Sequence, residues 1–213
     1  MEGFTDEQIA QMHDEFVGKL LSTGREGTQV LIEWLENNHF FEMPCSTQYH
    51  LACKGGLVRH SLNVCNTIRT MAKAVCTLEN VPDYNSLMIV SLLHDIGKVG
   101  FHGKPNYVEN WIKDGRPTKA EPEQKYKISE SKPYKTNPNL LYLPHAIRSA
   151  EIASMFIELT EDEEFAIVAH DGLYGEMKYI IPGHETSLYL LLHSADLWCS
   201  RVIENEGEEK ADE

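Results

Sequence analysis

The sequence predicts a single all-α domain. Apolar residues recur at intervals of three or four along most of the 213 residues, and helix-capping patterns precede several of these runs. Convincing alternation of apolar and polar residues, the mark of paired strands, is confined to residues 100–143. With 42% hydrophobic residues the chain can bury one core, so we expect one domain over residues 1–203 and an acidic tail over 204–213.

The first two helices are interpreted as scaffold. TDEQ at residues 5–8 is a capping-box pattern, and the helix that follows is expected to stop at Gly24. A second short helix is predicted around residues 30–35. Residues 40–56 contain Pro, Ser, Thr and paired Gly, which predict a loop, and we interpret its lone His50 as structural.

A long helix is predicted from Leu57 onward, with His60 in its first turn. His60 falls on an apolar stripe at helical spacing, whose other members are Val64, Ile68, Met71, Val75 and Leu78. A histidine on a core face is usually a hydrogen-bonded core residue. The preceding glycine pair favours a ligand instead, because it delivers the side chain to the end of the bundle.

The next helix carries the stretch SLLHDIGK, residues 91–98. It is expected to be capped by Asp83, Asn85 or Ser86 and to stop at Gly97, so that His94 and Asp95 lie at its end. A buried imidazole beside a buried carboxylate is costly unless a cation compensates. Adjacent helical residues point about 100° apart, but a loosened helix end lets both face one ion.

Residues 100–143 form the least regular part of the sequence, and we interpret them as a lid-like insert. A short hairpin is predicted within KYKISESKPYK, and Trp111, Tyr107, Tyr126, Tyr134 and Leu140 are expected to anchor the segment. Residues 98–143 hold nine basic and five acidic residues, a net charge of +4, which leaves −18 on the rest of the chain. This basic segment suggests a surface that faces a phosphorylated substrate.

Three further helices are predicted in the C-terminal part. Pro144 is expected at the first helical position with His145 beside it, and TEDE at residues 160–163 is a second capping box for a helix ending at His170. The last helix should run from Glu185 to about Ile203 and carry Asp196 within an apolar stretch.

Composition limits the classes of function. A formal charge of −14 argues against general electrostatic capture of nucleic acid or an anionic membrane. The apolar runs are too short for a membrane span and the N-terminus is acidic, so we expect a soluble, cytoplasmic protein. Five cysteines without a CxxC pair fit reduced, structural thiols.

Several histidines and aspartates share one pattern: they lie at element ends or on apolar helix faces. These candidate metal ligands are His60, His94, Asp95, His170, Asp196 and His145. Imidazole and carboxylate without thiolate suit a divalent Mn, Fe, Co, Ni, Zn or Mg ion, and spacing does not choose among them. Four ligands would hold one ion, and His145 with His170 could supply a second that shares Asp95.

Five motifs carry a resemblance to a known family. In chain order they are GGLVRHSLNV, SLLHDIGK, PHAIRSAEIA, AHDG and PGHETSLYLLLHSAD. They resemble the HD-domain superfamily of metal-dependent phosphohydrolases, over about residues 28 to 203. The similarity is greatest to small bacterial and phage HD hydrolases and to the HD domain of YhaM-type 3′ to 5′ exoribonucleases. It implies an HD-domain helical bundle with an insert after the HD motif.

The resemblance also implies roles. The first metal histidine of the family matches His60, its HD doublet matches His94 and Asp95, and its closing aspartate matches Asp196. Lys98 matches a lysine used near substrate phosphate, and His145 and His170 resemble the second-metal histidines of two-metal members. Related domains often have HHG where this chain has His-Asp-Gly at residues 170–172, so the chain departs from the family's pattern at the second metal position.

The expected activity is metal-assisted hydrolysis of a phosphoester in a nucleotide or short oligonucleotide, as a phosphomonoesterase, phosphodiesterase or nucleotide hydrolase. Catalytic candidates are Asp95, Lys98 and Arg148; substrate-binding candidates are Lys98, Arg148, Lys132, Tyr134 and Lys135. Candidates for the general acid are Glu176, Glu185, His50 and His193.

The expected partner is a small phosphorylated molecule, such as a nucleotide, with short single-stranded nucleic acid as the other possibility and no membrane. The missing nucleic-acid-binding domain of YhaM-type nucleases weakens the RNA alternative. Two other functions remain open: an HD-type di-iron oxygenase, and a non-catalytic nucleotide-binding or regulatory module. The sequence does not indicate an oligomeric state.

Overall fold

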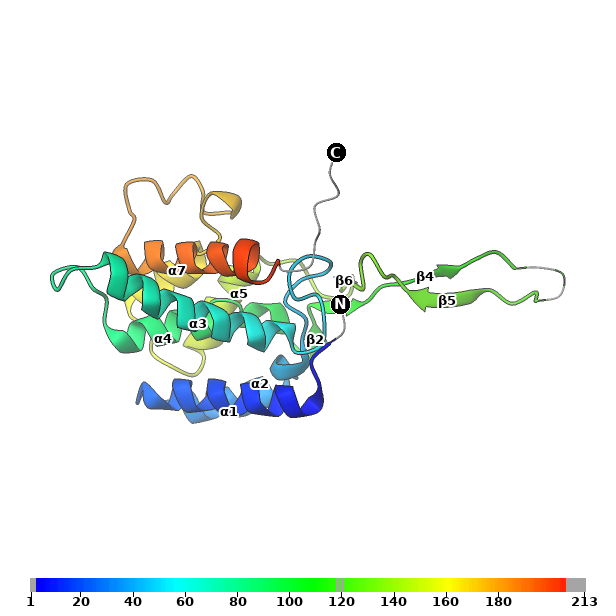
Figure 1. Ribbon diagram of the computed structural model, residues 1–213, viewed down its shortest axis with the longest axis horizontal. Helices are drawn as coiled ribbons and strands as arrows, with labels where there is room; N and C mark the ends of the chain where they lie inside the picture. Colours follow the sequence, from blue (N-terminus) through cyan, green and yellow to red (C-terminus); the bar gives the residue numbers. More distant parts are fainter. Residues whose placement is uncertain (1–2, 118, 120, 206–213) are drawn as a thin grey trace.

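The computed structural model describes residues 3–117, 119 and 121–205, and it is mostly helical, at about 51%. Figure 1 shows the helices layered side by side in one body from which a two-stranded arm extends. The α-helices are α1 (Asp6–Ser22), α2 (Thr28–Asn37), α3 (Gly56–Val75), α4 (Tyr84–Leu93), α5 (His145–Ser154), α6 (Glu161–Ala169) and α7 (Ser187–Trp198). Short helical turns are η1 (Phe40–Glu42), η2 (Ile96–Val99), η3 (Gly172–Tyr174) and η4 (Cys199–Ile203).

Local sequence signals explain most helix starts. Thr5 and Thr160 both form complete capping boxes, and the Asp83 carboxylate accepts two backbone N–H groups at the start of α4, as predicted. Pro144 is the N-cap of α5 rather than its first helical residue, because its ψ of 130° is not helical. The last α-helix begins at Ser187, later than predicted, since Thr186 caps it.

The core surrounds α3 and α4, and Figure 1 shows α1 and α7 on opposite sides of this pair. One cluster joins α3 and α4 to α1 and α2, and the other joins them to α6 and α7. The predicted stripe of α3 is buried at Val64 and Ile68. It was wrong for Val75 and Leu78, which are 69% and 99% exposed, because α3 ends at Val75 and Leu78 lies in the turn that follows.

The insert contains three antiparallel strand pairs. They are β1 (Gly100–Phe101) with β2 (Lys104–Pro105), β3 (Tyr107–Glu109) with β6 (Tyr134–Thr136), and β4 (Trp111–Asp114) with β5 (Lys125–Ile128). The predicted hairpin within residues 125–135 is therefore wrong, since β5 and β6 pair with earlier strands instead of with each other. The chain folds back on itself in one long ribbon.

The β4–β5 arm is exposed along its whole length, and Figure 1 shows it extending away from the helical body. Trp111 and Tyr126 are 53% and 57% exposed, so the prediction that they anchor the insert is wrong. The insert contacts the helical body at the base of the arm, where the Tyr134 amide donates to the Thr47 carbonyl (3.2 Å). None of the described helices combines the length and the apolar character needed to cross a membrane.

Candidate metal centre

The predicted ligands come together from five helices. They are His60 in the first turn of α3, His94 and Asp95 at the end of α4, His145 at the start of α5, His170 at the end of α6, and Asp196 in α7. Of these, His60, His94, Asp95 and His170 are at most 1% exposed. The structure therefore gathers in one place side chains that the sequence spreads over much of the chain.

His60, His94 and Asp196 form a first group of possible ligands. The Nε2 atoms of His60 and His94 lie 3.2 Å apart, and Asp196 Oδ1 lies 3.1 Å from His60 Nε2. With metal–nitrogen bonds of about 2.1 Å and angles of about 90° to 109°, two ligand nitrogens lie about 3.0 to 3.4 Å apart. The observed spacing fits one shared ion.

His145, His170 and Asp171 form a second group. The Nε2 atoms of His145 and His170 are again 3.2 Å apart, and Asp171 Oδ2 lies 3.6 Å from His145 Nε2. Asp171 directly follows His170 and supplies the carboxylate of this group.

Asp95 lies between the two groups. Its Oδ2 atom is 3.5 Å from His60 Nε2 and 3.6 Å from His94 Nε2. Its Oδ1 atom is 3.1 Å from His145 Nε2 and 3.5 Å from His170 Nε2. One carboxylate thus faces both groups with different oxygens, which is the arrangement of a bridging ligand.

The second nitrogen of each buried histidine fixes how its ring is turned. The Nδ1–H groups of His94 and His170 donate to the carbonyls of Ser91 (3.0 Å) and Ile167 (2.7 Å). A carbonyl oxygen can only accept, so Nδ1 carries the proton and Nε2 keeps its lone pair when the ring is neutral. Partners of this kind support metal-binding histidines.

Two observations show that the cluster fits a divalent cation. First, neutral imidazoles whose Nε2 lone pairs face each other repel unless a proton or a metal ion lies between them. Second, Asp95 Oδ1 is buried and lacks a hydrogen-bond partner of good geometry among the described residues. Nitrogen and carboxylate donors without thiolate suit a borderline divalent ion, although they do not identify it.

The protonation of the histidines follows from burial and from the neighbouring carboxylates. Burial lowers the pKa of His94 to about 3. Burial also disfavours the charged form of His170, but Asp95 and Asp171 outweigh it and raise its pKa to about 9. Burial disfavours the charged form of His60 as well. Neighbouring groups, among them the carboxylates of Glu204 and Asp196, outweigh burial and raise the pKa of His60 well above its ordinary value. Without metal, protons on His60 and His170 can take the place of the ions.

Lys98, the predicted phosphate contact, reaches the cluster. Its Nζ lies 2.5 Å from Asp95 Oδ2, and its side chain lines the cavity in front of the ligands. Burial opposes the ionisation of both partners, yet their mutual attraction raises the pKa of Lys98 and lowers that of Asp95 well beyond the ordinary values. Lys98 therefore brings a fixed positive charge to the cavity wall.

Two glycines permit the close packing around the cluster. A Cβ atom on Gly97 would overlap the His145 carbonyl oxygen, so only glycine lets η2 pack against the first turn of α5. Gly172 has φ +59° and faces the ring of His193, which a Cβ would also overlap. The glycine of the HDIGK stretch thus serves helix packing.

Reasoning from sequence missed Glu204 and placed it in the acidic tail. This residue is 7% exposed, and its carboxylate accepts the Nδ1–H of His60 at 2.9 Å and an amide hydrogen of Asn63 at 2.9 Å. The π-turn η4 directs it back toward α3, through a hydrogen bond from the Glu204 amide to the Cys199 carbonyl. The Glu204 carboxylate thus orients the ring of His60, just as backbone carbonyls orient the rings of His94 and His170.

His50 and Cys45 also border the cluster. His50 Nε2 lies 3.4 Å from Cys45 Sγ and 3.9 Å from Glu204 Oε2, and both residues belong to a further group of possible ligands with His60. Burial lowers the pKa of His50 to about 4 and raises that of Cys45 to about 12. His50 is thus neutral and Cys45 an unreactive thiol when no metal binds them.

Arg148 was predicted to be catalytic, but the structure places it elsewhere. It is 3% exposed, and its guanidinium donates to the Asn106 side chain (3.2 Å) and to the Leu141 carbonyl (3.1 Å). Arg148 therefore ties both ends of the insert to α5, and it is absent from the described lining of the cavity.

Three predicted substrate contacts are also outside the described cavity lining: Lys132, Tyr134 and Lys135. Tyr134 lines a separate surface pocket with Cys53 and Lys54. The physical reason is that β6 pairs with β3, at the base of the arm. Among the general-acid candidates, His50 and His193 line the cavity and Glu176 and Glu185 are not part of its described lining.

The cavity in front of the cluster has a volume of about 140 Å³. Its described lining is His50, Lys98, His145, His170, Asp171, Tyr174, His193, Asp196, Leu197, Ser200 and Arg201. No protein-family model, curated protein or solved structure matches the chain. The chemistry of the cluster therefore rests on its own geometry.

Proposed function

We propose that the protein is a metal-dependent phosphohydrolase that cleaves a phosphoester bond of a nucleotide or a short oligonucleotide. The observation that carries this proposal is the double cluster around Asp95, with two pairs of histidine nitrogens 3.2 Å apart. Its ligands follow the order His60, His94, Asp95 and Asp196 along a helical bundle, which supports assignment of the fold as an HD domain.

A bound divalent ion would supply hydroxide at neutral pH, by lowering the pKa of its water toward about 7, and would polarise the phosphoryl oxygen. His60, His94 and Asp196 would hold one ion, while His145, His170 and Asp171 would hold a second, with Asp95 between them. The buried carbonyl and carboxylate partners keep the histidine rings in place, so that little reorganisation is needed.

The residues of the cavity wall would handle the substrate. Hydrolysis forms a phosphorus–oxygen bond to water and breaks the bond to the leaving oxygen, which needs a proton. Lys98 faces the cavity and would attract the phosphoryl oxygens. His193 donates its Nδ1–H to the His170 carbonyl at 2.7 Å, so Nε2 of the neutral ring keeps its lone pair. This Nε2 would take a proton from the attacking water and pass it to the leaving oxygen.

The test is hydrolysis of a panel of phosphomonoesters, phosphodiesters and nucleoside triphosphates by purified protein with added Mn²⁺, Co²⁺ or Mg²⁺. We expect release of phosphate or nucleoside from at least one substrate, and loss of this activity in Asp95→Ala. Absence of turnover for the whole panel, with metal content confirmed, would reject the proposal.

Asp95 also supports a second candidate, a di-iron oxygenase, because each of its oxygens faces a different pair of histidines. His60, His94, His145 and His170, with Asp95, would hold two iron ions, which would supply oxygen chemistry. Protein loaded with iron under anaerobic conditions would then consume oxygen with an organic substrate, whereas a phosphohydrolase would release phosphate without oxygen. Lys98 at the cavity wall favours the phosphohydrolase.

A further inference from the structure

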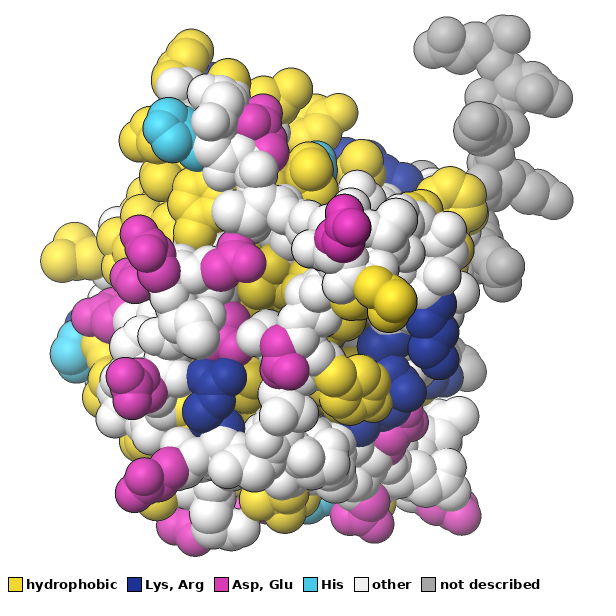
Figure 2. All heavy atoms as spheres, turned by 90° about the vertical axis from the view of Figure 1, so that its left-hand side faces the viewer, with side chains coloured by type: hydrophobic (Ala, Val, Ile, Leu, Met, Phe, Trp, Pro, Cys, Tyr) yellow, Lys and Arg dark blue, Asp and Glu magenta, His cyan; other side chains and the backbone are white. Residues whose placement is uncertain are grey.

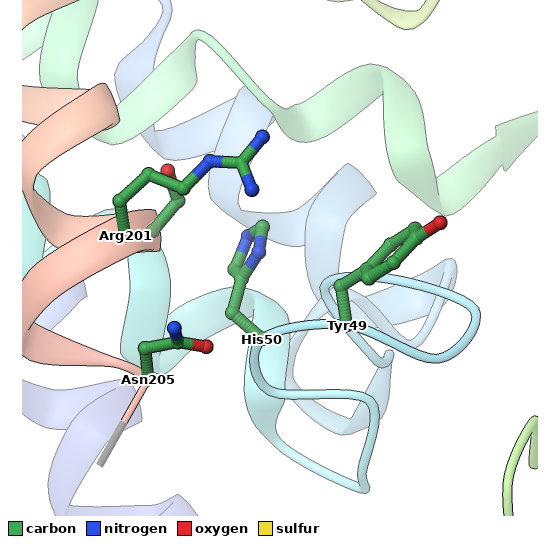
Figure 3. A pocket seen from close by; sticks show the side chains of 5 residues that line it. Tyr49, His50, Arg201 and Asn205 are labelled. Atoms are coloured by element: carbon green, nitrogen blue, oxygen red, sulfur yellow. The ribbon is translucent and has the colours of Figure 1, made fainter. Parts of the chain in front are cut away.

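A second, larger cavity lies next to the metal cluster. It has a volume of about 450 Å³ and is lined by Tyr49, His50, Ser200, Arg201 and Asn205 (Figure 3). His50, Ser200 and Arg201 also line the cavity in front of the metal ligands. The two spaces therefore share one wall, and a molecule bound at the cluster can extend into the outer cavity.

Arg201 is the charged residue of this shared wall. Its side chain forms no hydrogen bond or ion pair with another residue of the part of the chain that the structure describes. Figure 3 shows its guanidinium group and the ring of His50 directed into the same space. In a chain with a net charge of −14, an arginine left unpaired beside a cavity is a candidate anchor for an anion.

The π-turn explains how Arg201 reaches this position. Residues Cys199–Ile203 follow directly after α7, which carries Asp196, and the wide turn brings Glu204 back to His60. The same turn that completes the support of a metal ligand thus places Arg201 at the border of the two cavities. Wide turns of this kind are often found at functional sites.

The opposite side of the outer cavity offers an aromatic surface. Tyr49 is 67% exposed, although its loop is fixed by Ser46, whose hydroxyl accepts from the Tyr49 amide (2.9 Å) and donates to the His50 carbonyl (2.9 Å). The described lining residues include no carboxylate. An exposed aromatic ring on a fixed loop can stack with a flat group. Stacking with a nucleobase does not depend on which base it is, because every base has an aromatic face.

We propose that the outer cavity is a second substrate subsite, in which Arg201 binds a phosphate group other than the one that is hydrolysed and Tyr49 stacks with the attached base. This rests on the proposed phosphohydrolase function and makes it more specific. The preferred substrate would carry two phosphates, either joined in a nucleoside diphosphate or separated by a nucleoside in a dinucleotide.

The experiment compares AMP, ADP and the 5′-phosphorylated dinucleotide pApA as substrates of the metal-loaded protein. For the substrate with the second phosphate at the right distance, Arg201→Ala should lower kcat/KM about tenfold to a hundredfold, the usual effect of removing a charge-assisted hydrogen bond. For AMP, which carries no second phosphate, the loss should be clearly smaller than for that substrate. A preference for ADP would show that the second phosphate is part of a diphosphate. A preference for pApA would show that it belongs to a neighbouring nucleotide.

Three further variants test the role of the Tyr49 ring and control for the loss of a positive charge. Tyr49→Phe should retain the preference for two phosphates, whereas Tyr49→Ala should weaken it, because stacking needs only the ring. Arg116→Ala is the matched control, since Arg116 is an exposed arginine in the insert, outside both cavity linings. It should leave all three substrates unaffected.

Binding gives a measurement that does not depend on turnover. Calorimetric titration of metal-free protein with pApA and ADP should show a Kd that rises about tenfold or more in Arg201→Ala. If binding depends on Arg201 while no substrate is hydrolysed, the phosphohydrolase proposal fails and the anion subsite stands. If hydrolysis occurs but Arg201→Ala changes AMP and the larger substrates equally, or changes none of them, the subsite is wrong.

Discussion

The carboxylate of Glu204 accepts the Nδ1–H of His60 at 2.9 Å, although the two residues are 144 positions apart in the sequence. This bond leaves Nε2 of His60 free to face His94 and Asp196. A carboxylate behind a metal-binding histidine orients the ring and raises its basicity. The end of the π-turn is therefore part of the candidate metal centre.

Glu204→Gln should weaken metal binding about tenfold to a hundredfold while preserving the fold, because the amide oxygen can still accept but carries no charge. Calorimetric titration with Mn²⁺ or Zn²⁺ and a circular dichroism spectrum measure the two effects. The exposed Glu79→Gln is the matched control and should bind metal normally. Unchanged affinity in Glu204→Gln would exclude a role for this carboxylate in the site.

Removal of metal should lower thermal stability. The ligands come from five helices, so an ion binds the folded chain far better than the unfolded one. At a free concentration of about 100 times Kd it would add about 2.7 kcal/mol to the free energy of unfolding. Melting curves with EDTA and with added metal measure this shift. Asp95→Asn should reduce it strongly, since Asp95 faces both groups; an equal shift in this variant would mean that metal binds elsewhere.

Glu163 should make the stability depend on pH in the acid range. It is fully buried and accepts hydrogen bonds from Arg25 (2.7 and 2.9 Å) and Ser86 (2.7 Å). Burial raises the pKa of Glu163, but these bonds lower it more, so the net shift is downward. The folded pKa is below the unfolded value, about 4.3. The stabilisation is therefore complete above that value and disappears as pH falls through the folded pKa.

Glu163→Gln should accordingly reduce the free energy of unfolding at pH 7 by about 2 to 3 kcal/mol. The difference between the variant and the original protein should shrink as pH falls below about 4. Glu164→Gln, an exposed neighbour in the same helical turn, should have little effect. Urea unfolding at several pH values measures the free energy of unfolding of both variants. If the difference between Glu163→Gln and the original protein grew as the pH fell, the stabilising role of the Glu163 carboxylate would be contradicted.

Gly97→Ala should destabilise the protein by about 1 to 3 kcal/mol, because the added methyl group collides with the backbone of α5 at His145 and Ser149. The shift of α5 should also weaken the second metal position, so metal stoichiometry should fall toward one. Gly18→Ala is the control, since its Cβ would have no atom within 4 Å and it lies inside α1. That variant should gain up to about 1 kcal/mol.

The β4–β5 arm should be dispensable for metal binding. Asn110 and Ser129 lie at its base, joined by a hydrogen bond from the Ser129 amide to the Asn110 carbonyl at 3.0 Å. Replacing residues 111–128 with a short glycine-rich turn should leave metal content unchanged. Loss of metal would show that the arm supports the cluster, and loss of turnover with full metal content would show that it acts as a lid.

The residues that gather in the cluster could be located from sequence because each one stands where a local rule applies. His60 follows a glycine pair at a helix start, and His94 and His170 end apolar helices. Capping residues and the period of apolar positions determine where these helices begin and end. Because the helix ends converge, the side chains at those ends lie close together. Asp196 was found because an aspartate inside an apolar run requires a partner.

Residues whose role depends on contacts between distant segments could not be predicted in this way. Glu204 has the composition of a solvated tail, and only the π-turn shows that it faces His60. The pairing of β5 with β4 depends on register across a long loop, which short-range patterns do not determine. Arg148 looked like a phosphate contact because nothing local shows that its partners lie in the insert.

The arrangement of the ligands also determines when the site can form during folding. One end of the cluster is His60 in α3 and the other is Asp196 in α7, so an ion held by both would close a chain loop that spans most of the helical body. Such long-range contacts are formed late, because the entropy of closing the loop must be overcome first. A nascent chain that has emerged only as far as α6 would already present His94, Asp95 and His170, yet it could not close the first ion position.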